Sequence, residues 1–199
     1  MPARRLLPSV LGALLLTACS DTEPLIDAPS TTTETAAVAA APALELGDFD
    51  PEGDFTLFDP CTEIPPEVLE QAGLGEPVGE SSYDRDLSVR CSFFPANQEV
   101  PGYYSLTGDR ITLERIKDRG LLLSSDAGSA TPDTYLHHMG ADFPDECSSA
   151  VHTNRGRFVV QYTEISTDQA REGLCRIATE ELETILNLMG ENNGDSHRS

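Results

Sequence analysis

The sequence predicts an α+β domain, with an antiparallel sheet of about five strands, helices packed on one face of that sheet, and two disulfides. Residues 87–93 alternate strictly between apolar and polar, which is typical of a half-buried strand. Residues 148–153 and 158–165 flank a turn at 154–156 and form the clearest hairpin. Residues 174–189 carry an apolar side chain every three or four positions, which indicates an amphipathic helix.

The remaining elements give the order α-β-β-α-β-β-β-α. A first helix is expected at 62–72, because the prolines at 65–66 are tolerated in a first turn and Gly73 ends the helix. Residues 111–119 fit either a strand or a helix that ends at Gly120, and we favour the helix. The expected strands are 87–93, 103–106, 135–139, 148–153 and 158–165, with a turn at 107–109.

The N-terminus has the features of an export signal. Arg4 and Arg5 precede an apolar run at 6–18, which is too short for the roughly 20 residues that a membrane-spanning helix needs. The run ends in Leu-Thr-Ala-Cys at 16–19, which resembles the bacterial lipobox, although an ordinary signal peptide that contains a cysteine is the alternative. We therefore predict a signal peptide at 1–18, and lipidation of Cys19 with two acyl chains, which is sufficient for stable anchoring.

A tether, a domain and a tail are expected after Cys19. Residues 20–55 contain nine acidic residues, no Lys or Arg and no amphipathic period, so we expect a disordered acidic tether. Residues 56–190 form the α+β domain, whose final helix is expected to be capped by Asp168 and to end at Gly190. Residues 191–199 are expected to form a disordered tail.

The charge balance excludes one class of partner. The 199 residues include 34 acidic against 13 basic side chains, a formal net charge of −21. Proteins that bind nucleic acid through the phosphate backbone need clustered Lys and Arg. The sequence therefore predicts no nucleic-acid partner.

The other four cysteines predict a disulfide framework. Five cysteines less Cys19 leave an even set, and an exported chain meets an oxidising environment. Of the three possible connectivities we favour Cys61–Cys91 and Cys147–Cys175, because each would tie a helix to a nearby strand. Zinc is the alternative, but the chain has no C-x2-C pair, and no metal or other cofactor is expected.

Several motifs of this domain resemble a known family of actinobacterial lipoproteins, domain-of-unknown-function family 3558. They are FDPCTEIPPEVL at 58–69, CSFF at 91–94, YLHHMG at 135–140, PDEC at 144–147 and RGRFVV at 155–160. The similarity covers roughly residues 56–188. The resemblance implies a lipobox, a domain of sheet and helices and two disulfides. It implies no activity and no catalytic residues.

Two groups of residues are weak candidates for chemistry. His137 and His138 are the best metal or acid–base candidates, but neighbouring side chains in a strand point to opposite faces, so the two do not readily share one metal. Half-exposed histidines without a special role are the alternative. Asp142, Asp145 and Glu146 cluster beside Cys147 and could serve acid–base catalysis, although such charges usually form a solvated surface.

The remaining acidic groups are expected to be solvated. Glu180, Glu181 and Glu183 are assigned to the exposed face of the last helix or its border. Residues 48–53 resemble the first half of a calcium loop, but position 12 of that loop is Asp59 instead of Glu, so an acidic linker is favoured. The chain carries no G-x-S-x-G nucleophile motif and no glycine-rich phosphate loop.

These patterns predict a lipoprotein anchored on the extracytoplasmic face of the cell membrane. We expect a non-catalytic module that interacts with the membrane through its lipid and binds an envelope protein, glycan or lipid. Two alternatives stay open. An enzyme acting on envelope polymers would need a cleft with converging carboxylates, whereas a carrier of apolar ligands would need an open apolar cavity.

Overall fold

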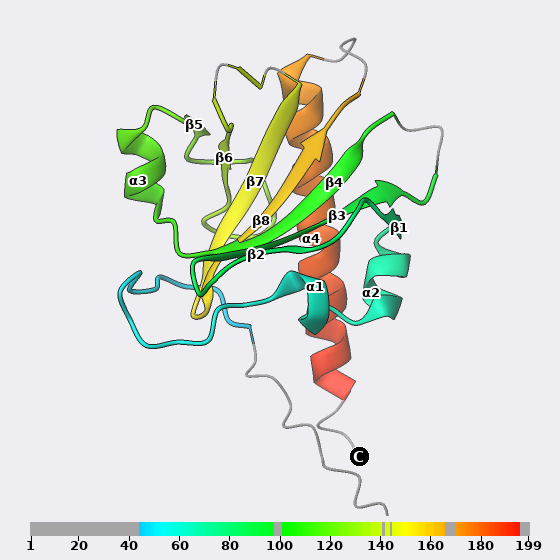
Figure 1. Cartoon of the computed structure of the whole chain (residues 1–199), viewed down its shortest axis with the longest axis horizontal. Coiled ribbons are helices and arrows are strands. Elements are labelled where there is room, and N and C mark those ends of the chain that lie inside the picture. Colours follow the sequence, from blue (N-terminus) through cyan, green and yellow to red (C-terminus); the bar gives the residue numbers. More distant parts are fainter. Residues whose placement is uncertain (1–43, 98–100, 141, 144, 166–169, 196–199) are drawn as a thin grey trace, which may run out of the picture. The chain divides into compact units, whose positions relative to one another are not determined.

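An antiparallel sheet of eight strands is the centre of the fold (Figure 1). In this computed structural model the described residues are 44–97, 101–140, 142–143, 145–165 and 170–195. The strands are β1 Leu74–Pro77, β2 Ser82–Asp84, β3 Ser88–Pro95, β4 Tyr103–Asp109, β5 Leu122–Ser124, β6 Tyr135–His137, β7 Glu146–Thr153 and β8 Gly156–Thr163. The helices are α1 Pro60–Glu63, α2 Pro66–Gln71, α3 Leu113–Asp118 and α4 Arg171–Asp195. The strand order is β1-β3-β4-β8-β7-β6-β5, and β2 pairs with β3 at the edge.

The long central strands divide their side chains between an apolar and a polar face. In the β7–β8 hairpin, Val151 lies opposite Phe158, and the next residues along, Ala150 and Val159, point to the other face. The apolar face packs against α1, α2 and α4, and Phe58, Leu106 and Val160 lie in its core together with Leu182 and Ile185 of α4. The sequence therefore places the larger hydrophobic core on this side of the sheet.

Both disulfides lie on the apolar side and attach a helix to a strand. Cys61 of α1 is bonded to Cys91 of β3, with Cα atoms 5.6 Å apart, and Cys147 of β7 is bonded to Cys175 of α4, with Cα atoms 4.9 Å apart. The favoured connectivity is thus confirmed. The Cys147–Cys175 bridge lies in a small cluster with Tyr162, Leu174 and Ala178.

The helices do not all lie on one face, contrary to the prediction. The short helix α3, at the left of Figure 1, contributes Ile116 to a separate cluster with Tyr135, Ala150 and Val159, which belong to the polar face. The favoured helical interpretation of 111–119 is confirmed, and Thr112 caps this helix by accepting a hydrogen bond from the backbone N–H of Arg115.

Four further expectations about the elements were wrong. The sheet has eight strands instead of about five, because β1, β2 and β5, of only three or four residues each, pair at its edges. The helix expected at 62–72 is divided into α1 and α2, since Ile64 and Pro65 are extended. The turn expected at 107–109 is part of β4, and α4 continues five residues past Gly190 to Asp195.

Gly108 explains why a turn was expected where a strand lies. A Cβ atom at this position would collide with the backbone carbonyl of Phe58, which crosses the sheet there. Gly108 therefore permits close approach of two backbones and does not mark a turn.

Residues 44–55, which composition assigns to the tether, lie against the domain. Leu46 forms a β-bridge with Thr153, and Gly47 donates its backbone N–H to the carbonyl of His152 over 3.1 Å. Arg110 donates to the carbonyl oxygens of Pro51, Gly53 and Phe55 over 2.8–3.1 Å. Hydrogen bonds of the backbone, which composition does not reveal, hold residues 44–55 to the domain.

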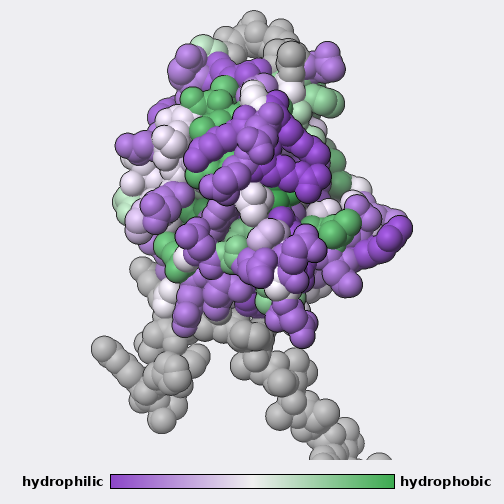
Figure 2. Space-filling view, turned by 90° about the vertical axis from the view of Figure 1, so that its left-hand side faces the viewer, coloured by the Kyte–Doolittle hydropathy of each residue, from purple (hydrophilic) through white to green (hydrophobic). Residues whose placement is uncertain are grey.

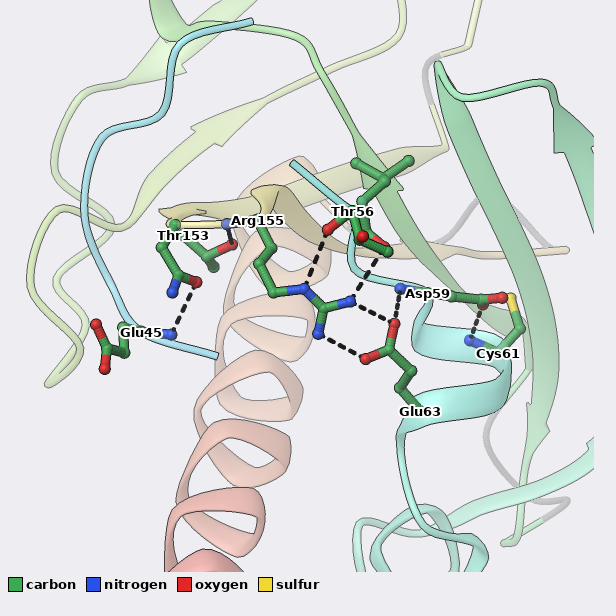
Figure 3. A network of polar contacts seen from close by, with 9 residues as sticks. Glu45, Thr56, Asp59, Cys61, Glu63, Thr153 and Arg155 are labelled. Carbon is green, nitrogen blue, oxygen red and sulfur yellow. Dashed lines mark hydrogen bonds and ion pairs between the residues drawn. The ribbon is translucent and has the colours of Figure 1, made fainter. Parts of the chain in front are cut away.

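One arginine fixes this N-terminal segment to the tip of the β7–β8 hairpin (Figure 3). Arg155 forms a bidentate ion pair with Glu63 of α1, at 2.6 and 2.8 Å, and donates to the carbonyls of Thr56 and Leu57. Glu63 also accepts the backbone N–H of Asp59, and Asp59 caps α1 through the N–H of Cys61. The network thus holds α1 in the position from which Cys61 reaches β3.

Candidate functional site

The polar face of the sheet carries two adjoining clefts. The first, which we call the basic cleft, has a volume of about 370 Å³ and is lined by three arginines, two histidines and one aspartate: Arg90, Arg119, Arg157, His137, His138 and Asp109. The second, the acidic cleft, has a volume of about 340 Å³ and contains Asp142, Asp145, Glu146 and Glu164. Arg90 and Met139 line both clefts and lie at the boundary between them.

A buried ion pair forms the floor of the basic cleft. Arg157 on β8 donates through Nε and Nη2 to both carboxylate oxygens of Asp109 on β4, at 2.9 and 2.6 Å, and both side chains are about 95% buried. These residues are opposite one another in the β4–β8 ladder, so the register of the sheet creates the pair. Burial opposes the charge of Arg157, but Asp109 outweighs this effect and the guanidinium pKa is raised.

The same arginine sets the protonation of His137. Arg157 Nη1 lies 3.2 Å from His137 Nε2, and because a guanidinium only donates, Nε2 accepts. Burial, reinforced by the charge of Arg157, lowers the pKa of His137 to about 3, and the backbone of His138 offsets a part of that fall. His137 is therefore neutral, and we assign its proton to Nδ1 from this hydrogen bond.

That proton has no acceptor within the described residues. His137 Nδ1 is buried and has no partner in hydrogen-bond geometry. The same is true of Nδ1 of His138, which lines the same cleft. A buried donor without an acceptor costs about 1–3 kcal/mol, so such groups are uncommon in folded proteins. The two adjacent histidines line the same cleft, because β6 ends at His137 and His138 lies beyond it.

Arg90 of β3 is held in place by neutral groups. Its Nε donates to Thr107 Oγ1 at 3.1 Å, and its Nη2 donates to Gln161 Oε1 at 3.0 Å and to the thioether sulfur of Met139 at 3.8 Å. No carboxylate of the described residues lies within ion-pair distance of Arg90. Its charge is therefore positioned but not neutralised.

The acidic cleft contains the carboxylate cluster that the sequence singled out. Glu146 accepts the backbone N–H of Met139 at 2.7 Å and the side-chain amide of Gln161 at 3.3 Å, and burial raises its pKa. Asp142 is exposed and Asp145 is half-buried. The three acids thus line one cleft, but only Glu146 is buried in the sheet.

The glutamates of α4 have three different environments. Glu180 is exposed and pairs with Arg176, whereas Glu183 accepts hydrogen bonds from Ser129 and the backbone N–H of Ala130. The expectation of a solvated Glu181 was wrong. Its side chain is buried near Tyr104 of the apolar face, its Oε1 has no partner among the described residues, and burial raises its pKa to about 8.

The acids of the calcium-like segment do not converge on one point. Asp48 lies 3.5 Å from His152, Asp50 accepts the backbone N–H of Glu52, and Asp59 caps α1. Across the described part of the chain no group of three or more His, Cys, Asp or Glu side chains is arranged to hold a metal ion. In the same residues no helix has the length and apolarity needed to cross a membrane. Cys19 and Asp168 lie outside the described residues.

Comparison with protein families supports the resemblance that the motifs indicate. The sequence profile described as Protein of unknown function (DUF3558) matches residues 14–188. The chain belongs to the DUF3558 family. The match is wider than the 56–188 expected from the motifs and includes Cys19. Searches of curated proteins and of solved structures returned no match for this DUF3558 chain.

The structure explains several of the family motifs and adds residues that the motifs did not mark. Asp59, Cys61, Glu63 and Arg155 form the network that fixes α1. His137 and His138 were singled out from the sequence, but Arg90, Asp109, Arg119 and Arg157 of the basic cleft were missed, although a signal exists. Residues at every second position of three strands, namely 88–92, 105–109 and 157–163, share one face, and all of them except Val159 are polar.

Proposed function

We propose that this DUF3558 chain is an extracytoplasmic lipoprotein, anchored through Cys19, that binds a ligand on the polar face of its sheet without transforming it. The basic cleft carries the proposal. The side chains of a sheet face that meets only solvent are usually exposed. His137 and Arg157 are nevertheless buried there, and His137 Nδ1 has no hydrogen-bond partner among the described residues. Such groups are typical of sites that are completed by a ligand.

The residues around the cleft favour binding over catalysis. No Ser, Thr or Cys side chain of the described residues is hydrogen-bonded to a histidine ring, which is the arrangement that activates a nucleophile. Nε2 of His137 is already engaged by Arg157, and its lowered pKa makes it a poor proton acceptor near neutral pH. Envelope-polymer modification therefore has less support than binding.

A carrier of apolar ligands also has less support. One cleft, of about 610 Å³, lies beside α4 and includes Leu123 and Leu136. Its wall also contains charged side chains, namely Arg171, Glu172, Arg176, Glu180 and Glu183. Burying an apolar ligand against these groups would cost the free energy of their desolvation.

Anchoring is tested by metabolic labelling with a fatty-acid probe. We expect label on the wild type and none on Cys19→Ser, which should be released from the membrane fraction. Equal labelling of the two chains would contradict the anchor.

Ligand binding is tested by purifying the full chain from its own envelope and identifying bound compounds by mass spectrometry after denaturation. Ser88→Trp places a large side chain at the rim of the basic cleft, and Ser125→Trp, at an exposed position outside it, is the control. We expect a compound that copurifies with the wild type and the control but not with Ser88→Trp. Chemical conversion of that compound by the purified protein would favour the enzyme, and a compound retained by Ser88→Trp would contradict the site.

A further inference from the structure

The charge of the basic cleft is opposite to that of the chain. The chain as a whole carries a formal charge of −21, and the neighbouring acidic cleft contains four carboxylates. The basic cleft holds three arginines against one carboxylate, Asp109, which is already paired with Arg157. Arg90 and Arg119 are left as the cations that a ligand would meet.

Arg119 and Arg90 differ in position and in restraint. Arg119 follows α3 and is exposed, as expected for a charge at the rim, where it would attract an anion. Figure 2, which views the side of the molecule that carries α3, shows a mostly hydrophilic surface with hydrophobic residues in small separate groups. Arg90 is half-buried and its guanidinium is held at two points by Thr107 and Gln161.

Two strong donors beside this cleft share a weak acceptor. Arg90 Nη2 and Gln161 Nε2 both point at the sulfur of Met139, at 3.8 and 3.3 Å. A thioether is a poor acceptor for a guanidinium or an amide, and Met139 is 43% exposed, so its side chain has room to move. An anionic oxygen would be a far better partner for Arg90 in the place of the sulfur.

His137 adds a neutral donor on the wall of the same cleft. Its Nδ1–H has no acceptor among the residues that the structure describes, and its other nitrogen is fixed by Arg157. Hydroxyl groups of Ser82, Ser88, Thr107 and Ser148 also line the cleft. Donors therefore outnumber acceptors on these walls, which is the composition of a site for oxygen-rich anions.

We propose that the basic cleft binds a small ligand that carries an oxyanion, a carboxylate or a phosphate, with its anionic oxygens on the Arg90 guanidinium and a further oxygen accepting from His137 Nδ1–H. This assignment of ligand class rests on the proposed binding function. The acidic cleft beyond Met139 limits the ligand, because a second anionic group there would meet Asp142, Asp145, Glu146 and Glu164. The ligand thus carries its negative charge at one end.

The proposal is tested by NMR on the full chain in detergent, following the Nε–H signal of Arg90 during titration. Sodium phosphate and sodium acetate are the two oxyanion probes, and sodium chloride at matched ionic strength is the control for screening. We expect a saturable shift with one or both oxyanions and none with chloride. The probe that saturates at the lower concentration distinguishes phosphate from carboxylate.

Matched variants decide whether the cleft is responsible. We expect Arg90→Gln to weaken the apparent affinity at least tenfold, followed through backbone signals of β3, and Arg90→Lys to retain part of it. Arg115→Gln removes the same charge from an exposed position of α3 outside the cleft and should change nothing. An unchanged affinity in Arg90→Gln, or an equal response to chloride, would overturn the proposal. If the oxyanions fail while a copurified compound is still lost in Ser88→Trp, only the ligand class is wrong and the binding function stands.

Discussion

The two faces of the same sheet are stabilised in different ways. The apolar face is covered by α4, α1 and α2, and the two disulfides attach it to α1 and α4, so its order follows from burial and cross-links. The polar face is covered only in part by α3, and its buried groups depend on hydrogen bonds and on the Asp109–Arg157 pair. Burial and cross-links hold the apolar face together, whereas the polar face keeps buried charged and hydrogen-bonding groups, as binding sites do.

The largest effect is expected from breaking the buried ion pair of the polar face. Asp109→Leu leaves Arg157 charged and unpaired in a buried position, and we expect the free energy of unfolding to fall by about 3–5 kcal/mol. Asp109→Leu combined with Arg157→Met removes both charges and should recover most of that loss. Urea unfolding of the three chains measures the difference. A double variant as unstable as the single one would show that the pair is not the cause.

A slightly smaller effect is expected from the apolar face. Replacing Cys147 and Cys175 together by Ala opens a bridge of sequence separation 28, which should cost about 3.5 kcal/mol on the chain-entropy estimate. The polar face should keep its structure, so the NMR signals of Arg90 and Arg157 should stay in place below the unfolding transition. Loss of those signals in the folded double variant would show that the faces are not independent.

The pH dependence of stability should separate Glu181 on the apolar side from His137 on the polar side. Burial raises the pKa of Glu181 from 4.5 to about 8, so the folded state holds the proton more tightly and stability falls as the pH rises from about 4.5 to about 8. The slope from this group approaches about 1.4 kcal/mol per pH unit. His137 has the opposite sign, because its pKa is lowered from 6.5 to about 3 and stability falls as the pH decreases through that window.

Glu181→Gln should remove the loss of stability above pH 6.5, where His137 no longer contributes. The exposed Glu180→Gln is the matched control and should leave the pH profile unchanged. Thermal unfolding from pH 4 to 9 measures all three chains. A wild-type profile identical to that of Glu181→Gln would contradict the burial of this carboxyl group.

The smallest effect is expected from an ion pair at the surface of α4. Arg176 and Glu180 lie four residues apart on the helix, 2.9 Å from nitrogen to oxygen, with both side chains 62% exposed. We expect Arg176→Ala to change the free energy of unfolding by about 0.5 kcal/mol or less, and less still in high salt. Comparing this variant with Asp109→Leu shows how strongly burial changes the contribution of an Arg–carboxylate pair to the free energy of unfolding. A loss above 2 kcal/mol would contradict that interpretation.

The local patterns of the sequence were sufficient for the elements that have a regular period. Strand β3, the β7–β8 hairpin and helix α4 follow from periods of 2 and 3.6, and the pairing Cys61–Cys91 and Cys147–Cys175 follows from which cysteines lie on neighbouring elements. The strand and helix periods depend on the chemistry of each segment alone. Burying alternate residues of a strand or one stripe of a helix is favourable wherever the partner lies.

Tertiary structure decided the features that depend on a distant partner. The three exposed residues of β2 show no apolar period and become a strand only because the edge of β3 offers backbone groups. Glu181 is buried by contact with the sheet, although its place in the helical period borders the polar side. The basic cleft exists because the register of four strands brings Arg90, Asp109, Arg157 and His137 to one face. A sequence records the residue types, whereas the distance between charges, which sets their pKa values and their free energy, arises only when the strands pair.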